Sequence, residues 1–571
     1  MDPISLFIIL ASILFFFWLF HIFRRLFFWL YFWQLKEYRV DRFLDGIKES
    51  RSIIFPRISF WSLILIVALY LSLSLATAHY IILLVGFFLY FILGFRAFYF
   101  VFKKEWNLPA FTSKMIILSL FFGGAILFLG IGNFVYFFRF LTSPFNYLFY
   151  LFLFEILFPL FVSIGIMLFQ IPTHFIKRNI IKNAKRKREK FKSLIVIGIT
   201  GSYGKTSTKE FLFEILSQKY KVSKTPANQN SEIGVAQTVL EELREDHQIF
   251  ICEMGAYKRG EIKAICDIVH PQIGILTGIS GQHISLFKSF KNIINTKYEL
   301  IASLPKDGTA IFNGEDEECR NLAQRTTVKK YIYYTFSKLV TEIEAHNNIW
   351  AEEIHETPDF IEFKTRTSKG EERIRLNLLG KYNVENFLGA VTCAIHLGIP
   401  LSSIRENALK IRPSETSIRK KVGENQTVIL DDSYSQNPDG VFAAIDHVNI
   451  YKGGKKIIVM PCLIELGKSA PSIHKSIGRA IGKVFDLAII TTPFYFEEIK
   501  IGAMESRMPK SKILFSNNPS DIKGKLKPYF SIGNVILIEG RVNQRIIASI
   551  IRRKNNFINH KTSDESFSTH L

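Results

Sequence analysis

The chain has 571 residues, which is room for three or four domains of ordinary size, and 72 Lys and Arg residues against 50 Asp and Glu give a formal net charge of +22. Phe, Leu, Ile, Tyr and Trp dominate the first 175 residues, whereas nearly all acidic residues follow Ile181. This split excludes a uniformly soluble chain. The basic residues cluster beside apolar segments, where they would meet anionic lipid head groups, so we expect no nucleic-acid partner.

Five stretches of the N-terminal region are apolar and about 20 residues long, the length that a helix needs to cross a bilayer. They are Ile4 to Phe23, Ile58 to Ala76, Tyr80 to Tyr99, Met115 to Phe138 and Tyr147 to Gln170. We expect residues 1–175 to form a transmembrane region of about five helices, followed by a basic juxtamembrane linker over residues 176–192. No basic segment precedes the first stretch, which argues against a cleaved signal peptide.

Basic residues indicate the orientation of these helices. They are frequent in residues 24–57, around Lys103, and from Lys177 through the KRKREK run at Lys185, and they are nearly absent from the loops in between. By the positive-inside rule the N-terminus lies outside and everything after the fifth stretch is cytoplasmic. We therefore expect a multi-pass protein of the inner (cytoplasmic) membrane whose catalytic domains are cytoplasmic.

An apolar run breaks into a glycine-rich loop over residues 195–207, IVIGITGSYGKTS. Glycines let backbone N–H groups turn toward a phosphate, Lys205 can reach the β- and γ-phosphates, and the Thr206 hydroxyl can hold Mg²⁺. Only two residues separate Gly201 from Gly204, so the spacing is shorter than in a standard P-loop. We predict a phosphate-binding loop made by Thr200, Gly201, Ser202, Tyr203, Gly204, Lys205, Thr206 and Ser207.

Short Ile- and Val-rich runs alternate with amphipathic, helix-length stretches from residue 193 onward, which is typical of βαβ units in a mostly parallel sheet. A second series begins beyond Pro413 with TVILDDSY. The predicted fold is an α-helical transmembrane region followed by α/β: a P-loop, parallel-sheet central ATP-binding domain over residues 193–411 and a Rossmann-like C-terminal domain over residues 412–553. Residues 554–571, rich in Asn, Ser, Lys and His, predict a disordered tail.

Two further strand ends offer metal ligands, because parallel strands bring their carboxyl ends to one edge of the sheet. QIFICEMG places Glu253 after a largely apolar strand, and metal coordination is a good reason to bury a carboxylate there. IGILTGISGQH places His283 on the same edge. A single His is more often structural than a ligand, and only its place in this series favours metal binding.

Eight segments occur in one order between Ser193 and Arg541: GITGSYGKTSTKE, TPANQNSEIGVAQTVL, CEMGAYKRGEI, TGISGQHISLF with NTKYEL, FNGEDEE, GKYNVENFLGA, LDDSYSQNPDG and IELGKSAPSIHKSIG. With them the chain resembles the Mur ligases, ATP-dependent amide-bond-forming enzymes of cell-wall synthesis. It is most similar to the MurF type, UDP-N-acetylmuramoyl-tripeptide:D-alanyl-D-alanine ligase. The apolar N-terminal region stands where MurF-type enzymes begin with a soluble UDP-binding domain.

The resemblance implies roles around the phosphates of ATP. Lys205 and the loop amides would hold the phosphates, Thr206 and Glu253 would coordinate one Mg²⁺, and His283 would bind a second. Lys297, in NTKYEL, matches a lysine that family members carbamylate, although by itself it would be expected to be an exposed helix lysine. Lys205, Lys297 and His283 are thus the catalytic candidates.

The resemblance also implies contacts to the rest of the nucleotide and a two-step reaction. Asn313 and Asp316 would flank the adenosine, Asn383 and Asn386 belong to a second nucleotide-side motif, and Asp432 would reach the ribose or phosphates when the C-terminal domain closes. A precursor carboxylate would attack the γ-phosphate of ATP, and an amine would then displace phosphate from the acyl phosphate. The implied partners are a UDP- or lipid-linked muramoyl peptide and an amino acid or dipeptide.

Four features depart from the family pattern. Tyr382 stands where the family has a histidine, Thr416-Ser417 replaces a Gly-Arg element with Arg419 nearby, and Glu539-Gly540-Arg541 replaces a late Lys-Gly-Ser. The fourth is the apolar N-terminal region itself. The first three weaken the assignment of amine contacts more than that of ATP contacts.

Two other functions remain open at this point. One is a Mur-like ligase that makes a poly-γ-glutamate-type or other envelope polymer. The other is a transporter or sensor ATPase, which predicts polar residues that face one another inside the spans. Among the predicted spans only Glu155 fits that second expectation, and it could equally be paired with a Ser or Tyr of a neighbouring span.

Overall fold

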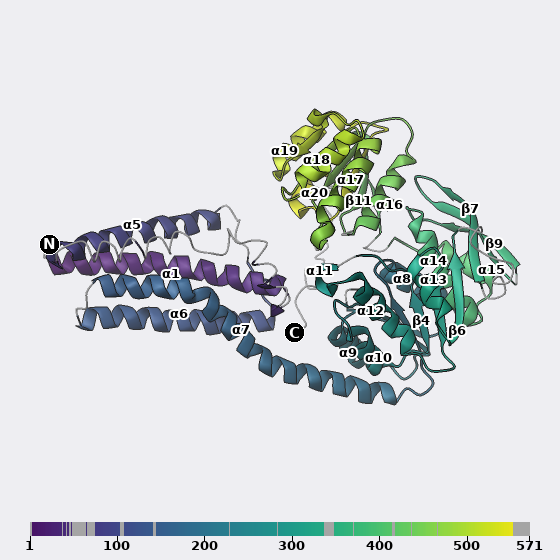
Figure 1. Cartoon of the computed structure of the whole chain (residues 1–571), viewed down its shortest axis with the longest axis horizontal. Coiled ribbons are helices and arrows are strands. Elements are labelled where there is room, and N and C mark those ends of the chain that lie inside the picture. Colours follow the sequence, from purple (N-terminus) through teal and green to yellow (C-terminus); the bar gives the residue numbers. More distant parts are fainter. Residues whose placement is uncertain are drawn as a thin grey trace, which may run out of the picture. The chain divides into compact units, whose positions relative to one another are not determined.

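The computed structural model describes residues 3–36, 38–40, 43–44, 47, 64, 75–102, 108–140, 144–227, 229–281, 284–335, 348–368, 370–413, 417–434, 437–464 and 466–551. Its contacts divide the chain into a helical unit that ends at Ile176 and an α/β unit from Lys177 to Asn556. Figure 1 shows the elements of both units. The predicted sequence of an apolar helical region and two α/β sheets is confirmed.

The first sheet of the α/β unit has nine strands in the order β2-β3-β1-β4-β5-β6-β7-β8-β9. The strands are β1 (Ile195–Thr200), β2 (Val222–Lys224), β3 (Ile249–Glu253), β4 (Ile273–Leu276), β5 (Thr309–Asn313), β6 (Lys329–Tyr334), β7 (Asn348–Glu356), β8 (Ile361–Thr367) and β9 (Gly370–Leu376). Strands β1 to β7 pair in parallel, so the ends of β3, β1, β4 and β5 lie side by side at one edge. This edge carries Glu253, Thr200 and Asn313.

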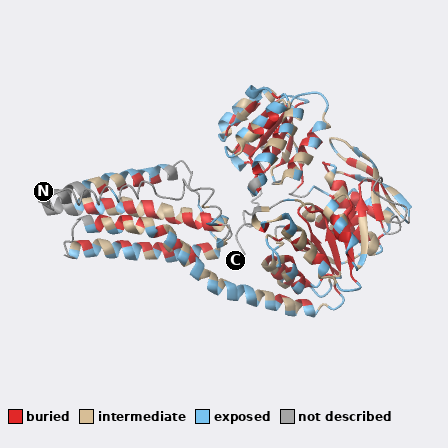
Figure 2. Cartoon of the chain, viewed as in Figure 1, coloured by how far each residue is buried: buried red, intermediate tan, exposed pale blue. Residues whose placement is uncertain are grey.

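Helices cover both faces of this sheet, as Figure 2 shows by the buried strands between half-exposed helices. They are α8 (Lys205–Leu216), α9 (Glu232–Glu241), α10 (Glu261–Val269), α11 (Ile284–Phe287), α12 (Phe290–Ala302), α13 (Glu317–Gln324), α14 (Tyr382–His396) and α15 (Leu401–Ala408). One apolar core joins the sheet to α8 and α14, and another joins it to α9, α10 and α12. Strands β1, β3, β4 and β5 are therefore buried on both faces, which explains their continuous Ile and Val runs.

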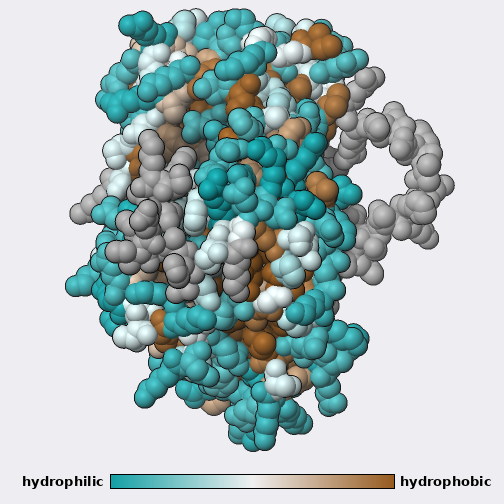
Figure 3. Space-filling model, turned by 90° about the vertical axis from the view of Figure 1, so that its right-hand side faces the viewer, coloured by the Kyte–Doolittle hydropathy of each residue, from teal (hydrophilic) through white to brown (hydrophobic). Residues whose placement is uncertain are grey.

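This sheet has an antiparallel end that was not predicted from the sequence. Strands β7, β8 and β9 pair in antiparallel fashion, and their burial alternates along each strand. The signal was present in the alternation of NIWAEEIHE and IEFKTRT, since one-sided strands show a period of two residues. Figure 3 shows the side that carries β9 and α15, where the surface is mainly hydrophilic.

The second sheet has six strands in the order β10-β11-β15-β12-β13-β14, all parallel except for the β10–β11 pair. The strands are β10 (Arg419–Val422), β11 (Val428–Asp432), β12 (Lys456–Met460), β13 (Leu487–Ile490), β14 (Ile513–Phe515) and β15 (Val535–Glu539). Helices α16 (Pro438–Asn449), α17 (Ala470–Val484), α18 (Phe496–Glu505), α19 (Pro519–Leu526) and α20 (Gln544–Ile550) cover it.

Among the described residues, the helical unit contains three long helices and the first part of a fourth: α1 (Pro3–Leu35), α5 (Leu75–Phe102), α6 (Ser113–Phe140) and α7 (Pro144–Glu189), which continues into the α/β unit. By length and composition, residues Ile9–Leu35, Ser113–Arg139 and Asn146–Glu189 could each cross a membrane, and Leu84–Tyr99 is a shorter apolar helix. Large apolar side chains such as Leu120 and Phe128 are exposed, 71% and 79%. Such a surface needs an apolar surrounding.

These helices confirm some of the predicted spans and correct others. The third, fourth and fifth stretches lie within α5, α6 and α7, while Ile58 to Ala76 lies mostly outside the described residues. The first stretch does not end at Phe23, because α1 continues to Leu35. Arg24 and Arg25 are therefore mid-helix residues and not part of a basic loop.

The end of α7 is not a free linker but packs on the central sheet's helices. Ala184 is completely buried in the core beside α9 and α10. Arg188 donates to the backbone oxygens of Val269, Phe191 and Leu194 at 2.8, 2.7 and 3.3 Å. Lys187 Nζ donates to Leu240 O at 2.7 Å. Part of the basic run therefore points into the α/β unit rather than toward lipid.

A buried polar cluster joins three helices of the helical unit. The Glu155 carboxylate of α7 accepts hydrogen bonds from Arg25 Nη1 at 3.0 Å and Tyr90 Oη at 3.1 Å, and its Oε1 lies 3.0 Å from His21 Nε2. We call these four residues the Glu155 cluster. Glu155 is thus paired with a Tyr of a neighbouring helix, as one alternative expected, but it also faces an Arg and a His of α1, so it is not the only residue that fits the pattern of polar groups facing one another.

Glu155→Leu should lower the melting temperature of the detergent-solubilised full chain, because it leaves the Arg25 guanidinium inside the helical unit without its carboxylate. The expected cost is about 1 kcal/mol or more. The double variant Glu155→Leu with Arg25→Leu should recover part of the loss, and Tyr150→Phe at an exposed position of α7 serves as the control. An unchanged melting temperature in Glu155→Leu would show that the cluster does not hold the helices together.

Candidate active site

The glycine loop connects β1 to α8, at the edge of the sheet where the parallel strands end. Thr200 Oγ1 donates to Met254 O at 2.9 Å, which ties the end of β1 to the chain leaving β3. Ser202 N donates to Gly278 O at 2.8 Å, and Ser280 N donates to Ser202 Oγ at 3.0 Å. The loop is thus held from both sides by the segments that follow β3 and β4.

Two positions in the loop admit only glycine. Gly201 has φ 155°, and Gly204 has φ 78°. A Cβ atom on Gly201 would lie 2.1 Å from Thr277 Oγ1, and one on Gly204 would lie 2.2 Å from Asn386 Oδ1. The backbone therefore approaches Thr277, just after β4, and Asn386 of α14 too closely for any side chain at these two positions.

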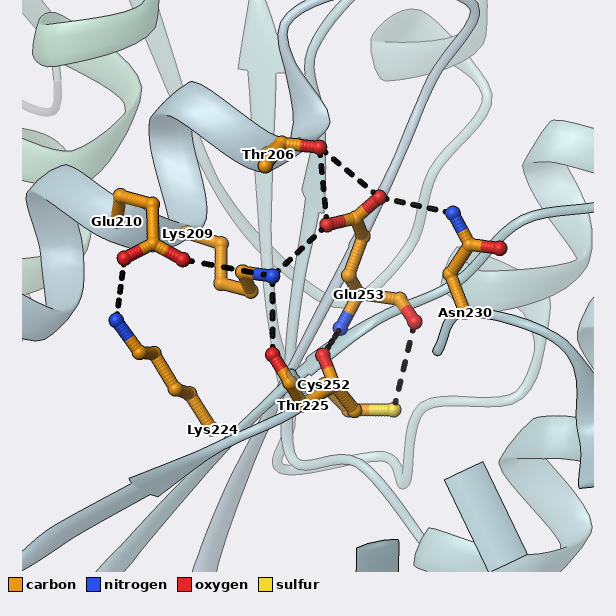
Figure 4. Close-up of polar contacts among 8 residues, drawn as sticks. All are labelled: Thr206, Lys209, Glu210, Lys224, Thr225, Asn230, Cys252 and Glu253. Atoms are coloured by element: carbon orange, nitrogen blue, oxygen red, sulfur yellow. Dashed lines mark hydrogen bonds and ion pairs between the residues drawn. The ribbon is translucent and has the colours of Figure 1, made fainter. Parts of the chain in front are cut away.

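Thr206 and Glu253 meet as the sequence predicted (Figure 4). Thr206 Oγ1 lies 3.1 Å from both Glu253 carboxylate oxygens, and Asn230 Nδ2 donates to Glu253 Oε1 at 2.9 Å. Glu253 is 3% exposed. A hydroxyl and an ionised carboxylate beside a phosphate loop are the oxygen ligands that Mg²⁺ prefers.

A buried lysine that the sequence analysis overlooked neutralises this carboxylate. Lys209, on the second turn of α8, has a side chain with 0% exposure, and its Nζ lies 3.1 Å from Glu253 Oε2. The same Nζ donates to Thr225 O at 2.9 Å, and Thr225 Oγ1 accepts from Glu253 N at 3.0 Å. Lys209 and Glu253 are therefore fixed by the same residue (Figure 4).

The charges around Glu253 keep its carboxylate ionised. Burial alone would raise its pKa, but the Lys209 and Lys205 ammonium groups and the Asn230 amide outweigh burial and hold the pKa below its usual range. Lys205 Nζ donates to Gly201 O at 2.8 Å, so its ammonium lies inside the loop. Burial lowers the pKa of Lys205, an effect that Glu253 partly opposes.

Lys297 is not the exposed helix lysine that its sequence alone suggests. It lies in the middle of α12 and is 4% exposed. Burial, with a contribution from Lys205, lowers the pKa of Lys297 to about 7. Near neutral pH this amine is therefore neutral in a large fraction of molecules, unlike an ordinary lysine with a pKa of about 10.4.

Asn313 and Asp316 help to build the loop's surroundings. Asn313 Nδ2 donates to Thr277 O at 2.9 Å and lies 3.3 Å from Glu385 Oε2. Asp316 accepts from Ile279 N at 2.9 Å and from Tyr203 Oη at 3.3 Å, and it caps α13. Both residues thus hold the segment after β4 against the glycine loop, in addition to any contact with a ligand.

The first turn of α14 reaches the same loop. Asn386 Oδ1 occupies the space beside Gly204, whereas Asn383 is completely buried and its Nδ2 donates to Leu379 O at 2.7 Å. Glu385, which the sequence analysis did not single out, lies between them. Burial, with the Glu315 and Asp316 carboxylates, raises the pKa of Glu385 to about 7.

Two of the departures from the family pattern, Tyr382 and Glu539, lie close to each other and to Asp432. Tyr382 packs against the C-terminal core, and its phenol pKa is raised by burial and by Asp432 and Glu539. Asp432 and Glu539 face each other across the paired strands β11 and β15. Burial, assisted by Asp431, raises the pKa of Asp432 to about 7. A substitution at one of these positions therefore changes the surroundings of the others.

The predicted metal ligands are only partly described. His283 lies outside the described residues, so its expected metal contact stays a prediction. Among the residues that the structure describes, no group of three or more His, Cys, Asp and Glu side chains is arranged to hold a metal ion. The Thr206–Glu253 pair is the described donor set, and phosphate oxygens would have to complete it.

Residues 199–394 match the Mur ligase middle domain. This part of the chain is thus a Mur ligase middle domain. The UDP-N-acetylmuramoyl-tripeptide–D-alanyl-D-alanine ligase of Synechocystis sp. is 32% identical over 300 residues, which are 52% of this chain and 60% of that relative. The same enzyme of Bacillus subtilis is 28% identical over 346 residues, 60% of this chain and 72% of the relative. The chain thus spans about three fifths of the length of the first of these relatives.

Solved Mur ligase structures match the α/β part of the fold. MurF from Acinetobacter baumannii aligns with a TM-score of 0.56 at 26% identity, over 64% of this chain and 78% of that chain. The MurF ligase of Thermotoga maritima, solved in complex with ADP, aligns with a TM-score of 0.54 at 23% identity, over 65% and 82%. The two sheets are therefore the central and C-terminal sheets of the MurF fold.

Lys209→Met should destabilise the α/β unit by about 3–5 kcal/mol, because it leaves the buried Glu253 carboxylate without its cation. Chemical denaturation of the detergent-solubilised chain measures this. Lys221→Met is the matched control, since Lys221 pairs with Asp246 at 2.9 Å on the surface and its loss should not be measurable. Equal stability of the two variants would contradict the role given to Lys209.

Proposed function

We propose that this protein is a membrane-anchored, ATP-dependent amide ligase that joins a muramoyl-peptide carboxylate to an amino acid or dipeptide of the D-alanyl-D-alanine type in peptidoglycan precursor synthesis. The observation that carries the proposal is the glycine loop whose Thr206 hydroxyl meets the buried Glu253 carboxylate. Together with Lys205, this places a cation, an anion and a row of backbone N–H groups where ATP phosphates and a metal ion can bind. The relatives' printed names supply the substrate class.

The donor set fits Mg²⁺. Thr206 and Glu253 would hold it, with Asn230 and Lys209 keeping the carboxylate in place. The ion would supply charge neutralisation for the phosphates of ATP. His283 is the proposed ligand of a second ion, and Asn313, Asp316, Asn383 and Asp432 remain the proposed nucleotide contacts.

The chain's own residues mainly position reactants in the proposed reaction. A carboxylate oxygen attacks the γ-phosphorus and ADP leaves; the amine nitrogen then attacks the acyl carbon, phosphate leaves and the nitrogen loses a proton. Lys205 and the loop N–H groups stabilise the negative charge on the transferred phosphoryl group. The proposed reaction needs no nucleophile from the chain, because the substrate carboxylate and the amine perform both attacks.

Lys297 is proposed to react with CO₂ to form a carbamate. Its neutral amine nitrogen would bond to the carbon of CO₂ and release one proton, which converts a buried amine into an anion. A pKa of about 7 makes the neutral amine available at the pH of a cell. The carbamate would help to organise the metal ions beside Glu253.

The helical unit supports a location at the inner membrane. Three described helices are long and apolar enough to span it. An N-terminus outside and cytoplasmic catalytic domains remain part of the proposal, now with the basic loop beginning after Leu35 rather than at Arg24.

Two other functions are alternatives to this one, and they differ from it in the substrates that they need for ATP hydrolysis. A Mur-like ligase that makes a poly-γ-glutamate-type polymer would use the same ATP site. An ATPase coupled to the helices is favoured by the Glu155 cluster, since buried ionisable residues inside spans often serve transport. The cluster's acidic and basic groups bond one another, however, which equally suits a clamp between helices.

The purified full chain, offered ATP, Mg²⁺, UDP-muramoyl tripeptide and D-alanyl-D-alanine, should release phosphate and form the pentapeptide product. Release should require both the carboxylate and the amine, and Lys205→Met should abolish it. Phosphate release with glutamate in place of the muramoyl peptide and the dipeptide would support the polymer ligase instead. Phosphate release without any of these substrates would support the coupled ATPase. Absence of release with the muramoyl pair, in both UDP- and lipid-linked forms, would refute the proposal.

Removing CO₂ from the buffers should lower the ligase activity of the wild-type chain, and bicarbonate should restore it. Activity should also fall as the pH decreases through about 7, because the Lys297 amine then becomes protonated and cannot form the carbamate. Lys297→Met should be slower by about 100-fold or more and insensitive to CO₂. Lys291→Met, exposed on the same helix, is the control. CO₂ sensitivity that persists in Lys297→Met would contradict the assignment.

A further inference from the structure

The basic end of α7 forms one wall of a pocket on the α/β unit. The cavity has a volume of about 540 Å³ and is lined by Arg178, Ile181, Lys182, Lys185, Arg186, Glu189 and Glu232. Six of these residues recur at helical spacing, so they lie on one side of α7. The seventh, Glu232, is the first residue of α9.

The opposite side of α7 holds this wall in place. Ala184 is completely buried, and Lys187 and Arg188 bond backbone oxygens of the segments around α9 and α10. The wall of the pocket is therefore a helix that is packed against the α/β unit. Its cationic side chains are directed away from the packed side, along about 16 Å of helix.

The charge of the pocket favours a polyanion. Four cations face two carboxylates, and within the described part of the chain Arg178, Lys182, Lys185 and Arg186 form no ion pair. The α9 helix also begins here, so its positive end adds to the field. Groups with several negative oxygens, such as a pyrophosphate, match clustered Lys and Arg side chains.

The pocket lies next to the candidate active site along the chain. Glu232 follows Ser231, the cap of α9, and Asn230 before it donates to Glu253. Only Ser231 therefore separates the pocket residue Glu232 from Asn230, whose side chain touches the proposed metal ligand. An extended tripeptide spans about 10 Å. A substrate whose carboxylate lies near Glu253 therefore has its pyrophosphate at least that far from Glu253.

We propose that this pocket binds the pyrophosphate of the muramoyl-peptide substrate. The inference rests on the proposed ligase function and adds where the substrate's phosphate end is bound. A UDP-linked and a lipid-linked precursor share the pyrophosphate, so the pocket accepts either chemistry. In this chain, the end of α7 takes over the recognition of the phosphate end from a separate N-terminal domain.

The test uses a full-length double variant that carries both Lys182→Glu and Lys185→Glu, called the pocket variant. It is compared with a matched double variant outside the pocket. The control is Lys177→Glu with Lys190→Glu, two exposed lysines of the same segment that do not line the pocket. In neutral detergent, the pocket variant should raise the KM for the muramoyl substrate about tenfold or more, while kcat and the KM for ATP stay unchanged. The control should match the wild type.

Inorganic pyrophosphate provides a second readout that does not need ligase activity. It should bind the wild-type chain in calorimetry, and the pocket variant should lose most of this affinity. Pyrophosphate binding without ligase activity would refute the proposed function and leave the anion site standing; ligase activity with an unchanged KM in the pocket variant would overturn the site alone.

The KM is measured with UDP-linked and with lipid-linked substrate, and in neutral detergent as well as in vesicles that contain anionic lipid. These assays distinguish the pyrophosphate of the substrate from the phosphate of lipid head groups. A KM effect with UDP-linked substrate alone, or with lipid-linked substrate alone, supports the site and identifies its natural ligand. An effect seen only in vesicles that contain anionic lipid, and absent in neutral detergent, would show that the basic side of α7 meets the membrane surface and would overturn the inference.

Discussion

The ion pair between Lys209 and Glu253 is the interaction on which the candidate site depends. A carboxylate that is 3% exposed would be costly in a protein interior without a cation, and Lys209 has no exposure at all. Thr225 bonds both residues, so α8, β2 and β3 are joined at one point. Because α8 follows the glycine loop directly, this ion pair also fixes where Thr206 and the loop N–H groups face.

Much of this arrangement could be predicted from the sequence because it depends on local order. Glu253 and the glycine loop each follow an apolar strand, and parallel strands bring their ends to one edge. Lys209 could not be recognised in this way. Its burial results from Thr225 and Glu253, which belong to other segments, and nothing within TSTKE distinguishes it from a solvated helix lysine. Lys297 shows the same limit, since its environment comes from the tertiary packing around α12.

In the helical unit, the positions of basic residues along the chain did not predict correctly where the first helix ends. Arg24 and Arg25 look like the start of a basic loop, yet α1 continues past them for another ten residues. What permits Arg25 to stay within the helix is Glu155, 130 residues later. The proximity of Tyr382 and Glu539 also could not be predicted from the sequence. It arises only because α14 and β15 both lie beside Asp432 in the folded chain.

The distance along the chain between Arg25 and Glu155 has a consequence for biogenesis. A ribosome makes α1 and α5 long before α7, so the guanidinium and the imidazole of α1 exist before their carboxylate does. During that interval these two groups need other polar partners. Completion of α7 ends the interval, and the catalytic unit is translated immediately afterwards. The order of synthesis thus brings all four residues of the Glu155 cluster into the growing chain before the first residue of the ATP loop is added.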